Sequence, residues 1–563
     1  MSLTARPTYL WLGIAIWLMI NLLQAGLTPL DPDEAYYWMY SNALDWGYFD
    51  HPPMVALMIK LGDALLPGTW GVRLFTVLLQ GGFIYLLWLL CGKPSERRDI
   101  AVFFAILVAM PLLQVYGFIT TPDAPLLFFS VLYLWVFERF LEKESWRNTL
   151  VLGLVMAALL YSKYHGVLLI FFTMLANLKL LIRPRFYLAG IFGFMLFFPH
   201  LYWQITHDFP SFRYHLKGRD DPYELKHTIN YLINQLVVFG PLVVPLLGRG
   251  LWKRYPAGNQ MERAYFFVLI GFWIFFFWTT FKGHVEPQWT IILCIPLVVF
   301  AVKQFVEDQQ YYRWYVGLGA TSLLLILILR VALTLPDLKL GNLNRQFRHQ
   351  QWVTALQERA GGLPVVFQNS YRDASVYTFY SGHQAYTFTD IDYRKNQFDL
   401  WDWEMKLNQK KVLFAGKDDW ECMNCEWLVA DNKKLQTKMV DRFQPNWKLE
   451  ATLHFPQGKP LKEGIVPVEL AFYHPYPYDL DCQNRKMPMS FQALFYDHAE
   501  LQDSARVQLT ESLGLVPAGD TIRRQARIAV PTKLHGKYDC YIGLQFLSFP
   551  PVFCSKPVEV NID

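Results

Sequence analysis

Residues 8–27 read TYLWLGIAIWLMINLLQAGL, a run without a single charged side chain. An α-helix needs about 20 mainly apolar residues to cross a bilayer, so this run predicts a transmembrane helix. Arg6 is the basic residue that precedes it, and a small-residue cleavage motif is lacking, so we expect a retained span and not a removed signal peptide. The N-terminus is then expected on the inner side of the membrane.

The composition of the whole chain agrees with a membrane protein. Of 563 residues, 53% are hydrophobic, 17% aromatic and only 18% charged, which is too apolar for a chain that folds wholly in water. Further long apolar runs lie at 72–91, 100–119, 125–141, 166–182, 186–206, 227–248, 264–281, 288–304 and 315–335, with a shorter run at 148–160. We therefore predict a polytopic α-helical membrane protein of about 11 spans.

Lysine and arginine are distributed unevenly over the connecting segments. If the N-terminus is inside, the inner connectors contain Lys93, Arg97, Arg98, Arg139, Lys143, Arg147, Arg183, Arg185, Arg249, Lys253, Arg254, Arg263, Lys303 and Arg313. This is the positive-inside pattern. One outer loop, 207–226, is also basic, and it either faces an anionic ligand or is a solvated loop balanced by its own carboxylates.

An odd number of spans places everything after about residue 335 on the outer side. Within 336–438, the run LPVVFQ (363–368) predicts a buried strand, and Ser370 with Asp373 predicts a capping box for a helix that ends at Gly382. We expect a small α/β domain there. Within 439–563, alternating runs such as VPVELAFYH predict an antiparallel β-sandwich.

The cysteines agree with an outer tail, because Cys422, Cys425, Cys482, Cys540 and Cys554 all lie in it. An oxidising compartment permits disulfides, although their pairing cannot be read from spacing. For the Cys422-x-x-Cys425 pair we favour a structural role over a redox-active pair or half of a zinc site.

Ionisable side chains gather at the expected outer ends of the spans. They are Asp33, Glu34, Asp50, His51, Asp123, Lys163, Lys282, His284 and Glu286. Charged groups at membrane depth cost roughly 2.5–3.5 kcal/mol each on insertion scales, so they usually mark a site or a pathway. Each has a plain structural interpretation of its own, as a cap, a turn residue or a snorkelling lysine, and the signal lies in their shared side.

These residue types suggest chemistry on a phosphorylated lipid. Carboxylates can take a proton from a nucleophile or hold a divalent cation, whereas Lys and His can neutralise a phosphate leaving group. The segment DPDEAYYW (31–38) separates into two parts: Asp31 as N-cap, Pro32 and Glu34 suffice to begin a helix, while Asp33 is not needed for it.

The motifs PDE after the first span, DHPP (50–53) and TPD (121–123) resemble those of bacterial members of the dolichyl-phosphate-mannose protein mannosyltransferase superfamily, and among them the lipid A aminoarabinose transferases. The resemblance covers residues 1–335. It implies a GT-C fold, polyprenyl-phosphate sugar donors, inversion at the anomeric carbon and an essential Asp in the first outer loop. That Asp falls on Asp33, and the second acidic position falls on Asp123.

One motif departs from the family. Asp50-His51-Pro52 stands where the aminoarabinose transferases have Glu-Lys-Pro, the Lys being linked to donor phosphate. His51 is either protonated there, or its task moves to Lys163 or Lys282, or it binds a metal with Asp50. A divalent cation therefore remains an open cofactor question.

We accordingly expect an inverting glycosyltransferase at the outer face of the bacterial inner membrane, with its tail periplasmic. The expected catalytic residues are Asp33, Glu34 and Asp123. The expected phosphate-binding residues are His51, Lys163, Lys282 and His284. Expected around the acceptor or cavity are Tyr37, Asp50, Glu286, Tyr371, Arg372 and Arg394.

The expected partners are a polyprenyl-phosphate sugar, a lipid, protein or glycan acceptor and the bilayer, for a monomer that binds no nucleic acid. Two other classes compete with this hypothesis. A lipid or sugar transporter would have its charges along the transmembrane path, and a non-enzymatic envelope assembly protein would leave the outer carboxylates unexplained.

Overall fold

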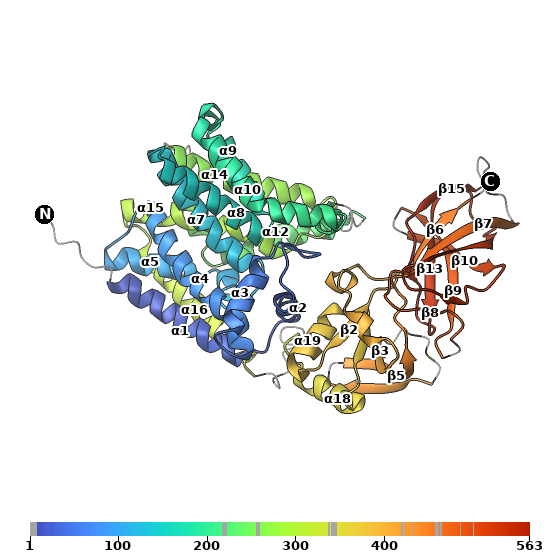
Figure 1. Ribbon diagram of the computed structural model, residues 1–563. Coiled ribbons are helices and arrows are strands. Elements are labelled where there is room, and N and C mark those ends of the chain that lie inside the picture. Colours follow the sequence, from blue (N-terminus) through green and yellow to red (C-terminus); the bar gives the residue numbers. More distant parts are fainter. Residues whose placement is uncertain are drawn as a thin grey trace. The chain divides into compact units, whose positions relative to one another are not determined.

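The computed structural model describes residues 8–216, 222–254, 259–335, 338, 346–417, 420, 422, 424–431, 433–455, 461, 464–484, 486–498 and 500–562. The chain divides into two compact units, Met1–Arg348 and His349–Asp563 (Figure 1). The first is helical and the second contains the strands. Each is described by itself.

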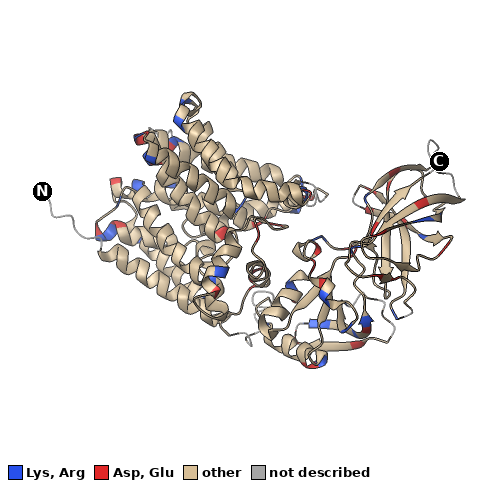
Figure 2. Ribbon diagram, in the orientation of Figure 1, with Lys and Arg blue, Asp and Glu red and all other residues tan. Residues whose placement is uncertain are grey.

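Long apolar helices dominate the first unit, and charged side chains are sparse along them (Figure 2). The helices long and apolar enough to cross a membrane are α1 (Thr8–Leu27), α4 (Gly68–Leu90), α7 (Asp123–Glu142), α10 (Pro184–Thr206), α14 (Gln260–Thr279), the continuous pair η2 and α15 (Pro287–Asp308) and α16 (Tyr312–Leu333). Among the described residues these are 7 spans, or 8 if α12 (Leu225–Phe239) and α13 (Val244–Lys253), bent by 90°, form one. A polytopic helical fold is confirmed, and the count of 11 is not.

Fewer helices reach the length of a span than the sequence predicts, because several apolar runs break. The run 100–119 becomes α5 (Arg97–Val108) and α6 (Pro111–Val115), since Pro111 has no N–H to continue the first helix. The shorter run 148–160 forms α8 (Trp146–Ser162), with 17 residues, and the run 166–182 divides into α9 (Gly166–Leu175), with 10 residues, and the 3₁₀ helix η1 (Leu178–Ile182). Apolar length alone does not show whether a run is straight.

Three short helices belong to the connections that we expected on the outer side. They are α2 (Pro32–Ser41), α3 (Met54–Asp63) and α11 (Pro210–Leu216). Helix α3 packs closely on α4, because a Cβ on Gly62 would lie 2.1 Å from the Gly71 carbonyl oxygen. In the basic loop 207–226, Arg213 pairs with Asp208 and Lys226 with Glu224, which favours the interpretation as a self-balanced loop. Residues 217–221 of that loop lie outside the described residues.

The second unit begins with an α/β sheet. Its strand order is β2-β1-β3-β5-β4, with β1 parallel to β2 and β3, and β5 antiparallel to β3 and β4. Its elements are α18 (Gln350–Ala360), β1 (Val365–Gln368), α19 (Tyr371–Ser381), β2 (Ala385–Phe388), β3 (Lys410–Gly416), β4 (Glu426–Ala430) and β5 (Lys433–Phe443). As predicted, Ser370 caps α19 by accepting from the Asp373 N–H, and Gly382 ends it with φ +71°.

The remaining strands form an antiparallel sheet in the order β14-β13-β9-β10-β12-β7-β6, with β15 on β13 and a separate β8–β11 pair. They are β6 (Glu450–His454), β7 (Gly464–Tyr473), β8 (Leu480–Asp481), β9 (Met489–Asp497), β10 (Glu500–Leu509), β11 (Leu515–Val516), β12 (Thr521–Val530), β13 (Gly536–Phe546), β14 (Val552–Phe553) and β15 (Val558–Ile562). Strand β10 pairs with β9 up to Arg506 and with β12 from Val507 onward, so it joins two halves of the sheet. Phe472 on β7 meets Phe491 on β9, with ring centroids 4.7 Å apart, as facing sheets do.

The two halves of this unit share a core. Phe388 of the α/β sheet contacts Phe546 and Phe549 of the β-rich part, at ring centroid distances of 5.1 and 4.8 Å. The three-domain division with a border at 438/439 stays a prediction. Cys422 and Cys425 form a disulfide, while Cys482, Cys540 and Cys554 are free thiols.

Candidate active site

Helix α2 begins as the sequence predicts. The Asp31 side chain accepts from the Asp33 N–H at 2.9 Å, and the Asp31 N–H donates to Glu34 Oε2 at 2.9 Å, which completes a capping box with Pro32 in the first turn. The Asp33 side chain is not part of this cap. It is half-buried, whereas Glu34 is fully buried.

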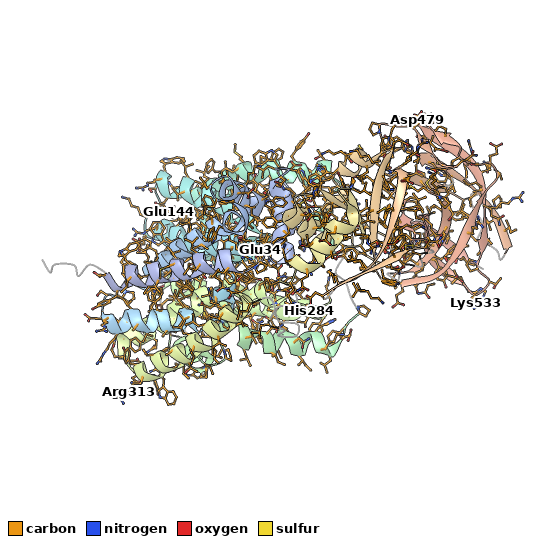
Figure 3. All side chains as sticks on the ribbon, turned by 90° about the horizontal axis from the view of Figure 1, so that it is seen from below. Glu34, Glu144, His284, Arg313, Asp479 and Lys533 are labelled. Carbon is orange, nitrogen blue, oxygen red and sulfur yellow. A yellow bond between two sulfur atoms is a disulfide. The ribbon has the colours of Figure 1, made fainter. Side chains whose placement is uncertain are left out.

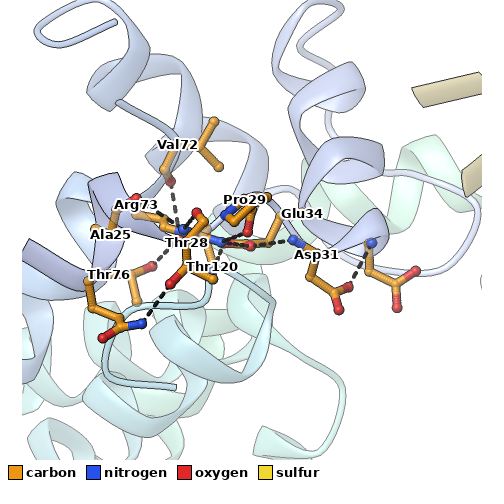
Figure 4. A network of polar contacts seen from close by, with 11 residues as sticks. Ala25, Thr28, Pro29, Asp31, Glu34, Val72, Arg73, Thr76 and Thr120 are labelled. Carbon is orange, nitrogen blue, oxygen red and sulfur yellow. Dashed lines mark hydrogen bonds and ion pairs between the residues drawn. The ribbon is translucent and has the colours of Figure 1, made fainter. Parts of the chain in front are cut away.

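Glu34 forms an ion pair with Arg73 of α4 (Figure 4). Arg73 donates from Nε to Glu34 Oε1 at 2.8 Å and from Nη2 to Oε2 at 2.5 Å. The Thr120 N–H, just ahead of α7, donates to Oε1 at 2.7 Å. With the Asp31 N–H, four donors surround the carboxylate, so Glu34 holds α2 in place.

Arg73 is equally saturated. Its remaining N–H groups donate to the carbonyl oxygens of Ala25, Thr28 and Pro29 at 2.6–3.0 Å. All five guanidinium donors are therefore used. The end of α1, the start of α2 and the segment before α7 are joined at this one buried pair.

A second buried ion pair joins two predicted site residues. Lys163, which ends α8, donates to Asp123 Oδ1 at 2.7 Å, and their side chains are only 6% and 5% exposed. Asp123 begins α7 directly after Pro122. The structure brings these residues together as predicted, but the charge of Lys163 is already neutralised by Asp123.

Tyr116 lies within electrostatic range of carboxylates from three segments. Its side chain interacts electrostatically with Asp123, Asp31, Glu286 and Asp33. Tyr116 is itself 8% exposed and ends the short helix α6. The predicted acids Asp33, Asp123 and Glu286 are therefore all within electrostatic range of one buried tyrosine.

The loop between α2 and α3 lies against α10 and α11. Trp203 Nε1 donates to Asp45 Oδ2 at 2.8 Å, and Ser211 Oγ donates to the Tyr48 carbonyl oxygen at 2.9 Å. Tyr164 hydrogen-bonds His200 Nε2 at 2.9 Å, and burial raises the pKa of the Tyr164 hydroxyl. This polar network holds the loop that carries Asp50 and His51.

Asp50 and His51 lie beside α11. His215 Nε2 contacts the Asp50 carbonyl oxygen at 3.0 Å, and the His51 ring lies 5.9 Å from Tyr37 and 6.1 Å from His215. Asp50 is buried and His51 half-buried. Among the described residues, no group of three or more His, Cys, Asp and Glu side chains is arranged to hold a metal, so the Asp50–His51 cation site stays a prediction.

Lys282, His284 and Glu286 follow α14 on one segment. Lys282 is exposed, and His284 Nε2 lies 3.8 Å from Glu286 Oε2 with both side chains partly exposed. Glu286, on this segment, is one of the carboxylates within electrostatic range of Tyr116. Lys282 and His284 are thus more accessible than Lys163.

A cavity of about 440 Å³ lies beside the loop between α2 and α3. Its lining is mostly apolar, from Leu44, Trp46, Pro53, Met54, Leu57 and Tyr161, with Asp45 as its one charged residue. Trp46 is 56% exposed and Leu44 is 49% exposed, so the wall is accessible to lipid. Asp33, Asp123 and Lys163 do not line this cavity.

The tail candidates form a cluster of their own in the second unit. Arg394 Nη2 donates to the Tyr371 hydroxyl at 2.7 Å, and its guanidinium lies 4.9 Å from the ring centroid. Arg372 lies 5.9 Å from the same ring. Their expected role with the acceptor stays a prediction.

Comparison with known proteins places this geometry in a wider group. A family model described as dolichyl-phosphate-mannose-protein mannosyltransferase matches residues 50–203. The lipid A galacturonosyltransferase RgtD of Rhizobium johnstonii is 22% identical over 318 residues, which are 54% of this chain and 61% of RgtD. The chain thus matches less than two thirds of that relative's length.

Two crystal structures of ArnT from Cupriavidus metallidurans share the fold. The apo structure gives a TM-score of 0.56 at 14% identity, over 76% of this chain and 97% of ArnT. The structure bound to undecaprenyl phosphate gives 0.55 at 16% identity, over 77% and 98%. The chain therefore shares the fold of ArnT, which agrees with the GT-C fold that the sequence resemblance implies. The resemblance to the lipid A aminoarabinose transferases, stated above from three short motifs, is confirmed.

Within this GT-C fold, two residues of the site were missed from the sequence. Arg73 is the single charge in the span GTWGVRLFTVLLQGGFIYLLWLL, and an isolated charge in a span is a signal that could have identified it. Tyr116 lies between two apolar stretches and has no such signal. Only folding places it among the carboxylates.

Proposed function

We propose that this protein is an inverting glycosyltransferase that moves a sugar from a polyprenyl-phosphate donor to an envelope acceptor at the periplasmic face of the bacterial inner membrane. The observation that carries the proposal is Asp33: a half-buried carboxylate in the first turn of α2, next to the buried Glu34, with both Asp33 and Asp123 within electrostatic range of Tyr116. A relative named for lipid A and an ArnT structure containing undecaprenyl phosphate support a lipid phosphate donor and make lipid A the first acceptor to test.

In this mechanism Asp33 is the general base. An acceptor hydroxyl attacks the anomeric carbon from the side opposite the phosphate, its proton passes to Asp33, and the bond between the anomeric carbon and the phosphate oxygen breaks. Holding the attacking oxygen in line with the departing one supplies much of the rate, because the encounter no longer costs orientational entropy. Helix α2 can hold that geometry because the Glu34–Arg73 pair anchors it.

The departing prenyl phosphate gains negative charge, which nearby cations stabilise. Lys282 and His284 are exposed on the segment that follows α14, and His51 lies on the loop between α2 and α3. Lys163 acts through Asp123 in this scheme, because their ion pair at 2.7 Å neutralises both. We assign Glu34 a positioning role and keep the catalytic roles for Asp33 and Asp123.

The test is a transfer assay in membranes with a labelled polyprenyl-phosphate sugar and lipid A as acceptor. Asp33→Asn should lower turnover by about 10²–10⁴-fold, the usual contribution of a general base. Asp31→Asn is the matched control, because it is the same chemical change two residues away and asparagine is as good an N-cap as aspartate. Retained turnover in well-expressed Asp33→Asn would remove the proposed base.

A further inference from the structure

A narrow cavity of about 190 Å³ lies among α1, α5 and α16, and none of the predicted site residues lines it. Its polar end is formed by Asn21, Gln114 and Arg330. Its apolar walls include Ile16, Ile20 and Leu327. The combination of one charged end and apolar walls suggests a ligand of the same character.

Arg330 is an unusual side chain for this place. It is in the last turn of α16, is only 5% exposed, and donates from Nη2 to Asn21 Oδ1 at 2.8 Å and to the Gln114 carbonyl oxygen at 2.9 Å. These partners are neutral. Its Nη1 is buried and, within the described part of the chain, has no hydrogen-bond partner. Arg73 by contrast has all five donors satisfied and a carboxylate to balance its charge.

Trp17 supplies a second unsatisfied donor in the same cavity. It is 6% exposed, and its Nε1 likewise has no hydrogen-bond partner within the described part of the chain. Trp17 precedes Asn21 by four residues on α1, which is about 6 Å along the helix axis at 1.5 Å per residue. The cavity thus offers a cationic donor at its polar end and a neutral donor deeper along an apolar wall.

Buried donors of this kind call for acceptors, and a buried guanidinium calls for negative charge. A phospholipid carries both in this arrangement: a phosphate, ester oxygens a few bonds away and then an acyl chain. The cavity also lies between two helices, α1 and α16, that are long and apolar enough to cross a membrane. Their side chains Leu324, Ile328 and Met19 are 60%, 59% and 57% exposed, as expected of side chains that face lipid.

We infer that this cavity binds one anionic phospholipid of the bilayer. The phosphate accepts from Arg330, an ester oxygen accepts from Trp17, and the first part of one acyl chain lies against Ile16, Ile20 and Leu327. The volume corresponds to roughly six waters at about 30 Å³ each, so it holds only this inner part of the lipid, and the remainder stays in the bilayer.

The bound lipid would lie close to the support of α2. The Arg330 guanidinium lies 5.3 Å from the Phe118 ring centroid, and the Arg73 guanidinium lies 5.5 Å from the same centroid. Arg73 in turn holds Glu34. Anionic lipid should therefore raise transfer activity, a consequence that rests on the proposed function, whereas binding itself does not.

Native mass spectrometry of the full-length, delipidated protein titrated with phosphatidylglycerol tests the binding. The wild type should bind one molecule of phosphatidylglycerol, with an affinity at least about tenfold higher than for phosphatidylcholine. Arg330→Gln should weaken phosphatidylglycerol binding by about tenfold or more, and Trp17→Phe should weaken it less. Arg313→Gln is the matched control, because it removes an exposed arginine from the other end of α16 (Figure 3) and should change nothing.

Equal retention of phosphatidylglycerol by wild type and Arg330→Gln would overturn the inference, as would equal affinity for phosphatidylcholine. Displacement of phosphatidylglycerol by an equimolar polyprenyl phosphate would assign the cavity to the donor instead. If Arg330→Gln does not fold, Trp17→Phe decides, because it removes one N–H and keeps the apolar ring. Asp33→Asn should retain the lipid, so failure of the proposed activity and failure of the lipid site are distinguishable.

Discussion

The buried Glu34–Arg73 pair gives the sharpest prediction about the fold. Glu34→Gln keeps the size of the side chain but removes its charge and turns one of its acceptors into a donor. The new amide N–H₂ must then face either the Arg73 Nη2 and Asp31 N–H groups or the Arg73 Nε and Thr120 N–H groups, which are all donors within 2.5–2.9 Å. The guanidinium is left buried without its counter-charge.

Removing one partner of a buried, hydrogen-bonded ion pair costs about 3–5 kcal/mol. We expect that loss in the free energy of unfolding of Glu34→Gln, measured by titrating the detergent-purified protein with SDS and following tryptophan fluorescence. Asp33→Asn, the same kind of change at the preceding residue, should cost less than Glu34→Gln, because the Asp33 side chain is only half-buried whereas Glu34 is fully buried. We therefore expect Glu34 to be needed mainly for stability and Asp33 mainly for turnover.

A double variant separates the pair from its surroundings. Glu34→Gln with Arg73→Gln should cost less than the sum of the two single changes by about 0.5–3 kcal/mol, since the uncompensated charge is gone. Some loss should remain, because the carbonyl oxygens of Ala25, Thr28 and Pro29 lose their donors. If the free energy of unfolding of Glu34→Gln lies within about 0.5 kcal/mol of the wild-type value, the loss is below the usual cost of a broken buried ion pair. The proposed anchoring role of the Glu34–Arg73 pair would then be wrong.

Three further predictions concern other parts of the chain. Lys163→Met should lower the free energy of unfolding by about 3–5 kcal/mol in the same titration, because it leaves the buried Asp123 without its counter-ion. Lys226→Met, which breaks an exposed ion pair, should lower it by under about 1 kcal/mol. Similar losses in the two variants would contradict the burial argument. Gly62→Ala should destabilise by about 1–3 kcal/mol, since its Cβ would meet the Gly71 carbonyl oxygen at 2.1 Å, while Gly190→Ala on α10, with nothing within 4 Å, should be neutral or stabilising. In the second unit, burial lowers the pKa of His474, so the unfolded chain binds its proton more tightly and stability should fall as the pH drops below about 6.5. His474→Gln should show a smaller decrease in melting temperature between pH 7.5 and pH 5.5 than the wild type, and an unchanged decrease would exclude His474 as a contributor.

Much of the local structure could be predicted from the sequence. The capping box at Asp31 and Glu34, the helix from Ser370 to Gly382 and the first span all depend on residues close together in the chain. Placing the span ends on one side of a membrane predicts that Asp33, Asp123 and Glu286 share a face, and in the structure all three lie within electrostatic range of Tyr116. The predicted count of 11 spans is not confirmed, because hydropathy does not register where a proline or glycine bends a run.

The roles within the site depended on contacts that the sequence does not contain. Glu34 was grouped with the catalytic acids, but its four donors come from the cap, α4 and the segment before α7. The sequence predicts that Lys163 binds a phosphate. In the structure Lys163 forms an ion pair with Asp123, 40 residues away in the chain. A pattern of residue types can show that charges share a side, but not which charge neutralises which.

Hydropathy and local capping are properties of neighbouring residues, so the chain alone specified a polytopic helical unit, a strand-rich tail and an acidic motif behind the first span. The partner of each buried charge is a property of long-range packing, because Coulomb attraction and hydrogen bonding act over a few ångströms in space whatever the distance in sequence. Folding therefore paired Glu34 with Arg73 and Lys163 with Asp123, and it left Arg330 Nη1 and Trp17 Nε1 without an acceptor in the described part of the chain.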